Sequence, residues 1–400
     1  MAGIDRREFL KVGAAGLLGL AAGEAGAAAE APRVRRRVRL GRTGLEVPDI
    51  GFGSSRLAGD VELVAHALAR GITYFDTADS YARGQSETTL GRALKGRREE
   101  VLLATKTQGG PESMRDELMR ALDGSLARLG TERVEIYFNH AVNDPARLRN
   151  DEWREFTARA KQQGKIRFTG ISGHGGRLVE CLDLALDERL VDVVLVAHNF
   201  GQDPAFHEQL TRGMDFVATQ PDLPRVLRKA RDQGVGVVAM KTLRGARLND
   251  MRPFEAGGAS FAQAALRWVL AGGLADSLVV TMTSEAQVDE YLGASGWTRS
   301  ARADAALLAR YEARHGAEQC RYGCNACAGA CPAGVSIGDA LRARMYAEDY
   351  GDLAMAREAW AEAGAGAACL SCAAKPCLGA CPHGLAIGAL TTRAAARLAG

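Results

Sequence analysis

Four polar residues lie where apolar, strand-like segments of the sequence end. Asp76, Lys106 and His140 each close such a segment, and Tyr81 lies in the loop just past Asp76. Reduction of a carbonyl by hydride needs a proton donor for the developing alkoxide and polar groups that stabilise it. We expect Tyr81 to be that acid, with its pKa lowered by the Lys106 cation that Asp76 holds, and His140 to orient the carbonyl oxygen. Singly, each residue also fits a structural role, but the combination favours catalysis.

Eight of the nine cysteines form a second constellation between residues 320 and 381. They fall into two groups of four, each ending in Cys-x-x-x-Cys-Pro: Cys320, Cys324, Cys327 and Cys331, then Cys369, Cys372, Cys377 and Cys381. An even set of cysteines in an exported protein is also compatible with disulfides, and zinc is a further alternative. Disulfides give no reason for a repeated Cys-Pro ending, and zinc more usually takes well-separated Cys-x-x-Cys pairs. The pattern therefore favours iron-sulfur clusters.

The cysteine spacing resembles that of bacterial two-cluster ferredoxins, in which the last cysteine of each group binds the other cluster. The resemblance implies two [4Fe-4S] clusters, one held by Cys320, Cys324, Cys327 and Cys381 and the other by Cys369, Cys372, Cys377 and Cys331. Two spacings depart from the ferredoxin pattern. Three residues, rather than two, separate Cys320 from Cys324, and four separate Cys372 from Cys377. A ligand exchange or a labile cluster therefore stays open.

Between about residues 49 and 282, β-rich apolar segments alternate with helical patterns, as in repeated βα units around a parallel sheet. The predicted strands are 49–53, 73–78, 101–106, 134–140, 166–172, 191–199, 234–241 and 276–282. Predicted helices include 61–70, 112–129 and 261–270, with Gly71, Gly130 and Gly234 as stop signals. Eight units predict an α/β fold, a (β/α)8 TIM barrel whose active site lies at the C-terminal ends of the strands.

The barrel region resembles the aldo-keto reductases motif by motif. The matching stretches are LGRTGLEV at 40–47, ITYFDTADSY at 72–81, Ser86-Glu87 and FTGIS at 168–172. The resemblance covers roughly residues 36–297. It implies a nicotinamide-dependent oxidoreductase acting on a carbonyl or alcohol, with a family tetrad at Asp76, Tyr81, Lys106 and His140.

The same resemblance implies where the nicotinamide cofactor NAD(P)H binds. Ser172, at the end of the fifth predicted strand, corresponds to a residue that contacts the nicotinamide amide. Lys241 and the stretch from Leu243 to Gly245 follow the seventh strand, near where the pyrophosphate lies in the family.

Three departures from the family pattern concern this cofactor. Gly173 stands where the family usually has Asn, and Leu195 where it often has Gln. This chain therefore has fewer polar side chains to bind the nicotinamide amide. Residues 281–285 (TMTSE) carry no cation for a 2′-phosphate, which leaves the choice between NAD and NADP open.

The N-terminus has the features of an export signal. Residues 5–11 (DRREFLK) precede a weakly apolar stretch and then small residues, which resembles a twin-arginine signal over 1–30. A membrane span needs about 20 apolar residues, so we expect no stable span. A disordered, Ala-rich tail is the alternative. We expect the folded protein to be exported by the twin-arginine machinery to the periplasm or cell exterior.

Composition indicates small-molecule partners. The sequence has 51 basic and 48 acidic residues and a net charge of +3, without a block that would indicate nucleic-acid binding. The basic run at 33–39 is better explained as a solvated strand face, and the lone Cys181 as a packing residue.

A shift in composition near residue 300 predicts a domain boundary. It separates the barrel, 36–297, from a small α-helical, ferredoxin-like iron-sulfur domain at 300–400. Within that domain, 300–315 and the apolar periodicity over 336–362 predict short helices.

Three functions compete. The first is an oxidoreductase whose clusters are structural or exchange electrons with a redox partner protein. The second is a ferredoxin-like electron carrier whose barrel binds or senses a ligand without turnover. The third is a docking barrel with a vestigial tetrad. The intact tetrad favours the first function. A hydride carries two electrons and each cluster accepts one, so electron transfer from nicotinamide to the clusters would need a mediator that passes the electrons singly.

Overall fold

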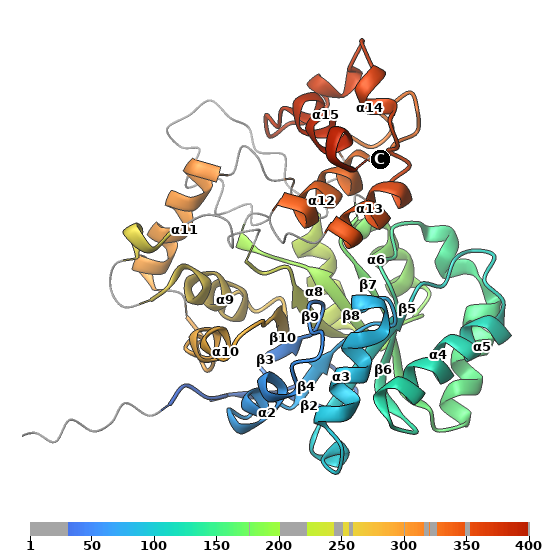
Figure 1. The fold of residues 1–400 in the computed structure, drawn as a ribbon, viewed down its shortest axis with the longest axis vertical. Coiled ribbons are helices and arrows are strands. Elements are labelled where there is room, and N and C mark those ends of the chain that lie inside the picture. The colour runs from blue at the N-terminus through green and yellow to red at the C-terminus, as the bar shows by residue number, and fades with distance from the viewer. Residues whose placement is uncertain are drawn as a thin grey trace, which may run out of the picture. The chain divides into compact units, whose positions relative to one another are not determined.

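The structure, a computed structural model, describes residues 31–175, 177–200, 222–243, 251–255, 259–299, 301–315, 320, 326–348 and 353–398 (Figure 1). The chain divides into two units, residues 1–32 and 33–400, and the second contains the described helices and strands. The predicted signal at 1–30 lies outside the described residues, and so do Cys324 and Gly245.

In the described chain, eight parallel strands close into a barrel in sequence order, with β10 beside β3 (Figure 1). They are Ile50–Gly53 (β3), Tyr74–Asp76 (β4), Leu102–Thr107 (β5), Val134–Asn139 (β6), Ile166–Gly173 (β7), Val193–Ala197 (β8), Gly236–Met240 (β9) and Ser277–Thr281 (β10). The predicted strands are confirmed, with ends that differ by at most two residues. Most strand residues are buried because side chains fill the barrel and helices cover it.

Helices follow the strands and form the outer layer. They are Val61–Ala69 (α2), Gln85–Ala93 (α3), Arg115–Leu129 (α4), Asp151–Gln162 (α5), Leu178–Asp187 (α6), Leu223–Asp232 (α8), Phe261–Ala271 (α9), Glu285–Leu292 (α10) and Arg302–His315 (α11). Asp60 caps α2, and Gly130 ends α4 with a φ of +62°. Helix α4 begins later than the predicted 112, because the preceding residues form a turn in which Ser113 accepts from the Gly110 amide at 2.9 Å.

An antiparallel hairpin, Arg37–Arg39 (β1) with Glu46–Pro48 (β2), lies at the N-terminal ends of the barrel strands. Both β1 arginines are exposed, as predicted for a solvated strand face. Leu40 and Leu45 join the barrel's inner core, and the Arg42 amide donates to the Gly234 carbonyl just before β9. The hairpin thereby covers this end and leaves the opposite end for ligands.

The C-terminal region contains Ile337–Glu348 (α12), Leu353–Glu362 (α13), Ala368–Ser371 (α14) and Ile387–Leu398 (α15). The first two confirm the helices predicted over 336–362. Residues 331–341 and 381–391 form a repeat in which Cys-Pro is followed by a glycine turn and then a helix. Gly334 and Gly384 have nearly equal φ values of +72° and +71°, a conformation that favours glycine. The Cys-Pro ends of the two cysteine groups therefore lie on equivalent local structures.

The packing boundary does not coincide with the predicted boundary at residue 300. Leu307, Leu308 and Tyr311 of α11 belong to the core between the barrel strands and their helices. Tyr311 packs against Phe261 of α9 with ring centroids 4.6 Å apart. Because its apolar face covers α9, helix α11 is part of the barrel's outer layer.

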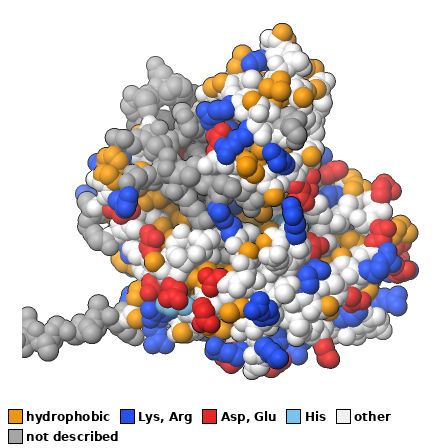
Figure 2. Space-filling model, in the orientation of Figure 1, with side chains coloured by type: hydrophobic (Ala, Val, Ile, Leu, Met, Phe, Trp, Pro, Cys, Tyr) orange, Lys and Arg blue, Asp and Glu red, His pale blue; other side chains and the backbone are white. Residues whose placement is uncertain are grey.

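The described surface carries both signs of charge. Figure 2 shows basic side chains interspersed with acidic ones over the visible face. Cys181 of α6 is wholly buried, as predicted for a packing residue. Among the described helices, none is both long and apolar enough to span a bilayer.

Candidate active site

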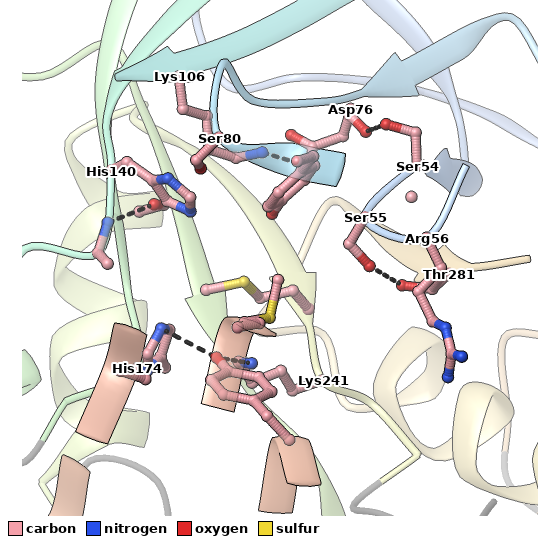
Figure 3. Close-up of a pocket in the computed structure, with 18 of the residues that line it drawn as sticks. Ser54, Ser55, Arg56, Asp76, Ser80, Lys106, His140, His174, Lys241 and Thr281 are labelled. Atoms are coloured by element: carbon pink, nitrogen blue, oxygen red, sulfur yellow. Dashed lines mark hydrogen bonds and ion pairs between the residues drawn. The ribbon is translucent and has the colours of Figure 1, made fainter. Parts of the chain in front are cut away.

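A cavity of about 730 Å³ opens at the C-terminal ends of the barrel strands (Figure 3). The predicted residues that line it are Asp76, Tyr81, Lys106, His140, Ser172, Lys241 and Leu243. Helices α12 and α13 form part of its wall through Tyr346, Met355, Arg357, Glu358 and Glu362. The structure thus brings the predicted barrel residues together and adds a wall that the sequence analysis did not predict.

Asp76 and Lys106 form a buried ion pair at the ends of β4 and β5. Lys106 Nζ donates to Asp76 Oδ1 at 2.6 Å and to the Thr77 carbonyl at 2.6 Å. Burial raises the pKa of Asp76 and lowers the pKa of Lys106, and the charge of each partner opposes the shift of the other. Asp76 Oδ2 is buried and accepts no hydrogen bond from the described residues.

Tyr81 lies against both Lys106 and His140. Lys106 Nζ is 4.9 Å from the centroid of the Tyr81 ring, and the His140 ring meets it edge-on with centroids 5.6 Å apart. The expectation that Lys106 lowers the pKa of Tyr81 is wrong for this structure. Burial raises that pKa, and the carboxylates of Asp76 and Asp79 raise it further, while Lys106 contacts the ring and donates elsewhere. The phenol is therefore protonated throughout the neutral range.

The Ser-Glu motif in α3 holds the loop that carries Tyr81. Ser86 Oγ is 2.9 Å from Thr77 Oγ1, which links α3 to the residue after β4. Glu87 is wholly buried and pairs with Arg128 of α4 at 2.7 Å. The two residues after Tyr81 have φ values of 48° and 56°, a left-handed conformation that is unfavourable for side chains other than glycine. The surrounding contacts therefore impose the position of Tyr81.

His140 follows β6 and is fixed through its backbone. Arg147, in the 3-10 helix Pro145–Arg149, donates to the carbonyls of His140 and Ala141 at 2.8 and 2.9 Å and to Asn139 Oδ1 at 2.6 Å. Burial lowers the pKa of His140 well below its usual value, and neighbouring cations add to the effect. The ring is consequently neutral at pH 7. Sequence analysis gave no signal for Arg147.

The predicted nicotinamide contact is buried at the end of β7. Ser172 Oγ accepts from the Ala141 amide at 2.9 Å, which leaves the hydroxyl proton to donate. A Cβ on Gly173 would lie 2.5 Å from Leu178 Cδ1, so the asparagine usual in the family would require Leu178 to move. Leu195 is wholly buried in the barrel's inner core and supplies no polar atom.

Lys241 interacts with a residue from the C-terminal helices. Its Nζ donates to the Tyr346 hydroxyl of α12 at 2.6 Å, and that hydroxyl is 3.4 Å from Nε2 of His174 (Figure 3). Burial lowers the pKa of Lys241 to about 7, and Arg342 adds to the shift. Sequence analysis placed Lys241 near the pyrophosphate of the cofactor. In the structure its ammonium instead donates to Tyr346. Sequence analysis did not single out Tyr346 or His174, since only tertiary contact brings them together.

Comparison with known families covers the whole barrel site. The model described as "Aldo/keto reductase family" matches residues 49–302, more than half of the chain. The matched range includes the strand ends that line the cavity. The chain belongs to the aldo/keto reductase family.

Curated relatives of this aldo/keto reductase match over part of their length. It is 33% identical over 232 residues to "Uncharacterized oxidoreductase YrpG" of Bacillus subtilis (strain 168), covering 52% of this chain and 66% of that protein. It is 30% identical over 158 residues to "Probable aldo-keto reductase 1" of Glycine max, covering 34% of this chain and 44% of that protein. The matched region thus spans less than two thirds of either relative.

Solved structures share the barrel. Aldo-keto reductase AKR11C1 from Bacillus halodurans, in its holo form, aligns with a TM-score of 0.54 and 22% identity over 69% of this chain and 95% of that chain. The thermostable aldo-keto reductase Tm1743, in complex with the inhibitor epalrestat, aligns with a TM-score of 0.54 and 26% identity over 69% of this chain and 99% of that chain. Both likenesses support the aldo/keto reductase fold.

The described cysteines of the C-terminal region lie beyond the matched residues and gather into two groups. Cys320, Cys327 and Cys381 line one small cavity. Cys331 and Cys372 lie near enough to Cys369 and Cys377 to raise the pKa of both thiols. Burial raises the pKa of Cys369 and Cys377, and the neighbouring thiols add to both shifts. Cys381 thus lies near Cys320 and Cys327 of the other sequence group, and Cys331 lies near Cys369 and Cys377.

The described cysteines form no disulfide with one another in this structure. Among the described residues, no three His, Cys, Asp or Glu side chains are arranged as ligands of a single metal ion. A four-iron cluster has a different requirement, because each thiolate binds its own iron and the ligands stand further apart. Apolar side chains, including Ile337, Leu385 and Ile387, pack against several of these partly buried cysteines. The crossed ligand sets stay a prediction.

Proposed function

We propose that this aldo/keto reductase is an exported enzyme that interconverts a small carbonyl compound and its alcohol with NADH or NADPH. We further propose that its C-terminal cysteines hold two [4Fe-4S] clusters that exchange electrons with a redox partner protein. The observation that carries the first proposal is one cavity in which Tyr81 contacts both His140 and the buried Lys106–Asp76 pair.

A bound reduced nicotinamide would supply a hydride to the carbonyl carbon. Tyr81 then gives its phenolic proton to the carbonyl oxygen, so that the C=O double bond becomes a C–O single bond with a new C–H and a new O–H bond, and the nicotinamide is oxidised. The raised pKa of Tyr81 keeps the proton in place until an alkoxide develops. Neutral His140 can donate one hydrogen bond to the same oxygen. Water then returns a proton to the phenolate that the pair Lys106–Asp76 flanks.

The cavity fits a nicotinamide at its β7 side. Ser172 keeps a hydroxyl proton for the amide oxygen, and Leu243 offers an apolar contact. Arg56, which follows β3, also lines the cavity, and its neighbour Ser55 bonds Thr281 at the end of β10. Arg56 thus brings a cation near the end of β10, whose own loop at 281–285 has no Lys or Arg. A cation here is compatible with binding of a 2′-phosphate, so both NADPH and NADH remain candidate cofactors.

The proposed clusters would supply one-electron transfer. Cys320, Cys324, Cys327 and Cys381 would hold one, and Cys369, Cys372, Cys377 and Cys331 the other. Because hydride carries two electrons, exchange between nicotinamide and cluster needs a mediator, so we assign the clusters to a separate partner. The second candidate function is a ferredoxin-like carrier whose barrel binds or senses a ligand without turnover.

Export by the twin-arginine route is consistent with these cofactors. The Arg-Arg motif at residues 6 and 7 and the small-residue stretch that follows support it. Clusters are assembled in the reducing cytoplasm, so a protein that carries them outward must be folded first.

An anaerobic titration tests the proposal. The protein is purified without residues 1–30, its iron and sulfide are assayed, and NADH or NADPH is added with and without a panel of aldehydes. We expect nicotinamide to be consumed only when an aldehyde is present, with cluster absorbance unchanged. Binding of nicotinamide without turnover of any aldehyde favours the ligand-sensing carrier, and bleaching of the clusters by nicotinamide alone contradicts a separate electron partner.

A further inference from the structure

The cavity contains a second Tyr, Lys and His, in addition to Tyr81, Lys106 and His140. Lys241 follows β9, His174 follows β7, and Tyr346 comes from α12 of the C-terminal region. The Tyr346 hydroxyl receives a hydrogen bond from Lys241 Nζ at 2.6 Å and lies 3.4 Å from His174 Nε2. The two sets have the same residue types but no residue in common.

The second set is built under strain and is incompletely satisfied. Lys241 adopts a φ of +54°, a left-handed conformation that a lysine holds only where the surroundings impose it. His174 Nδ1 is buried and has no hydrogen-bond partner among the described residues. Strained backbone and orphaned polar atoms concentrate at ligand sites, because a ligand completes the contacts that the fold alone leaves unmade.

Both sets line the same cavity, so one bound molecule can meet residues of both. The positive charge of Lys241 lowers the pKa of both His140 and His174, and His140 in turn acts on His174. Lys106 and Arg147 face His140, while Arg342 of α12 faces Lys241 and His174. On the α13 side, the cavity wall carries Arg357, Glu358 and Glu362. A substrate at Tyr81 therefore meets a second polar centre within the same cavity.

We propose that Tyr346, Lys241 and His174 bind a second oxygen of the substrate, a hydroxyl or carbonyl close to the one that Tyr81 and His140 act on. Helix α12 then selects oxygen-rich carbonyl compounds over simple aldehydes. This inference rests on the proposed carbonyl reduction. Tyr346 is a specificity-determining residue in this account, while the proton transfer stays with Tyr81.

The hydrogen-bonding capacity of the set fits this role. Lys241 has three donors as an ammonium and becomes an acceptor as an amine, and its pKa of about 7 makes both forms available at neutral pH. The Tyr346 hydroxyl both donates and accepts. A hydroxyl on the substrate can therefore find a donor and an acceptor in either protonation state.

A kinetic comparison tests the selection. Glyceraldehyde carries hydroxyls that propionaldehyde lacks, and both are offered to the full enzyme and to Tyr346→Phe. We expect the wild-type enzyme to prefer glyceraldehyde in kcat/KM by about tenfold, and Tyr346→Phe to lose that preference through a higher KM, since one hydrogen bond is at stake. The matched control is Tyr311→Phe, a buried ring of α11 away from the cavity, which should leave the preference intact. An unchanged preference in Tyr346→Phe overturns the proposal.

A measurement without turnover separates this inference from the proposed function. Lys241 is one of eight lysines, so its side-chain resonance can be identified in isotope-labelled protein by its loss in Lys241→Met. We expect it to titrate near pH 7 and to shift when propylene glycol, an unreactive diol, is added to wild-type protein but not to Tyr346→Phe. If neither aldehyde is reduced, the proposed function fails, and this shift still supports the second centre. Its absence in the wild-type protein overturns the inference whatever the turnover.

Discussion

The Nζ atom of Lys106 lies 2.6 Å from Oδ1 of Asp76, and both side chains are almost wholly buried. Neither charge could persist alone at this depth, because burial disfavours the charged form of each. Together they keep a cation 4.9 Å from the centre of the Tyr81 ring. The pair is thus part of the site and also a point on which the stability of the barrel depends.

Replacing Asp76 with Asn should destabilise the protein by about 3–5 kcal/mol, because it leaves Lys106 buried without its counter-ion. Chemical unfolding followed by circular dichroism measures the change. The control is Glu100→Gln, which removes the exposed pair with Arg97 and should leave the unfolding midpoint unchanged. An Asp76→Asn midpoint as high as that of the control would show that the pair contributes nothing.

The buried histidines predict a loss of stability on the acidic side of neutrality. Burial lowers the pKa of His140 and His174 well below the usual 6.5, so the unfolded chain binds protons that the folded chain does not. The free energy of unfolding should therefore fall as the pH drops below 6.5, by at most about 1.4 kcal/mol per pH unit for each ring. His174→Gln should make this slope shallower. A slope identical to that of the wild-type protein would contradict the assignment.

Arg147 is predicted to position His140. Lysine at this position cannot reproduce the planar fork that reaches three backbone carbonyls and an amide oxygen. Arg147→Lys should lower kcat at least about tenfold with little change in KM, since a small displacement of a catalytic group is costly. Arg149→Lys changes an exposed arginine of the same turn and serves as the control. Equal kcat values in the two variants would remove the positioning role.

Crossed cysteine ligation predicts which variants resemble each other. Cys381→Ser and Cys320→Ser should each lose about half of the iron and leave the same remaining cluster spectrum, because both disrupt one cluster. Cys331→Ser should instead match Cys369→Ser. Electron paramagnetic resonance of the reduced proteins distinguishes the two spectra, and Cys181→Ser controls for the loss of a buried thiol. If Cys331→Ser matches Cys320→Ser, ligation follows the sequence groups and the crossed model fails.

Local patterns in the sequence predicted the barrel well. The eight strands are short apolar runs such as VVLVA in β8, and glycines such as Gly130 end the helices that follow them. Asp76, Tyr81, Lys106 and His140 could be predicted to line one cavity because a barrel brings its strand ends together. The direction of the Tyr81 pKa was missed, since it depends on burial and on where the ammonium of Lys106 points.

Contacts between distant segments were the part that sequence analysis could not reach. Lys241 and Tyr346 are 105 residues apart, and neither the spacing nor the composition indicates that they meet. The assignment of α11 failed for a related reason. Its Ala/Arg-rich composition resembles that of the residues after it, whereas its Tyr311 packs on Phe261 of the barrel layer.

The most direct test of the account is Tyr81→Phe, measured for both nicotinamide binding and aldehyde turnover. The substitution removes one hydroxyl from a ring whose position is set by the surrounding loop. We expect nicotinamide fluorescence titrations to match the wild-type protein, while turnover falls by about 10²- to 10⁴-fold, the usual contribution of a general acid. Turnover within a few-fold of wild type would contradict Tyr81 as the proton donor and, with it, the assignment of this cavity as the site of carbonyl reduction.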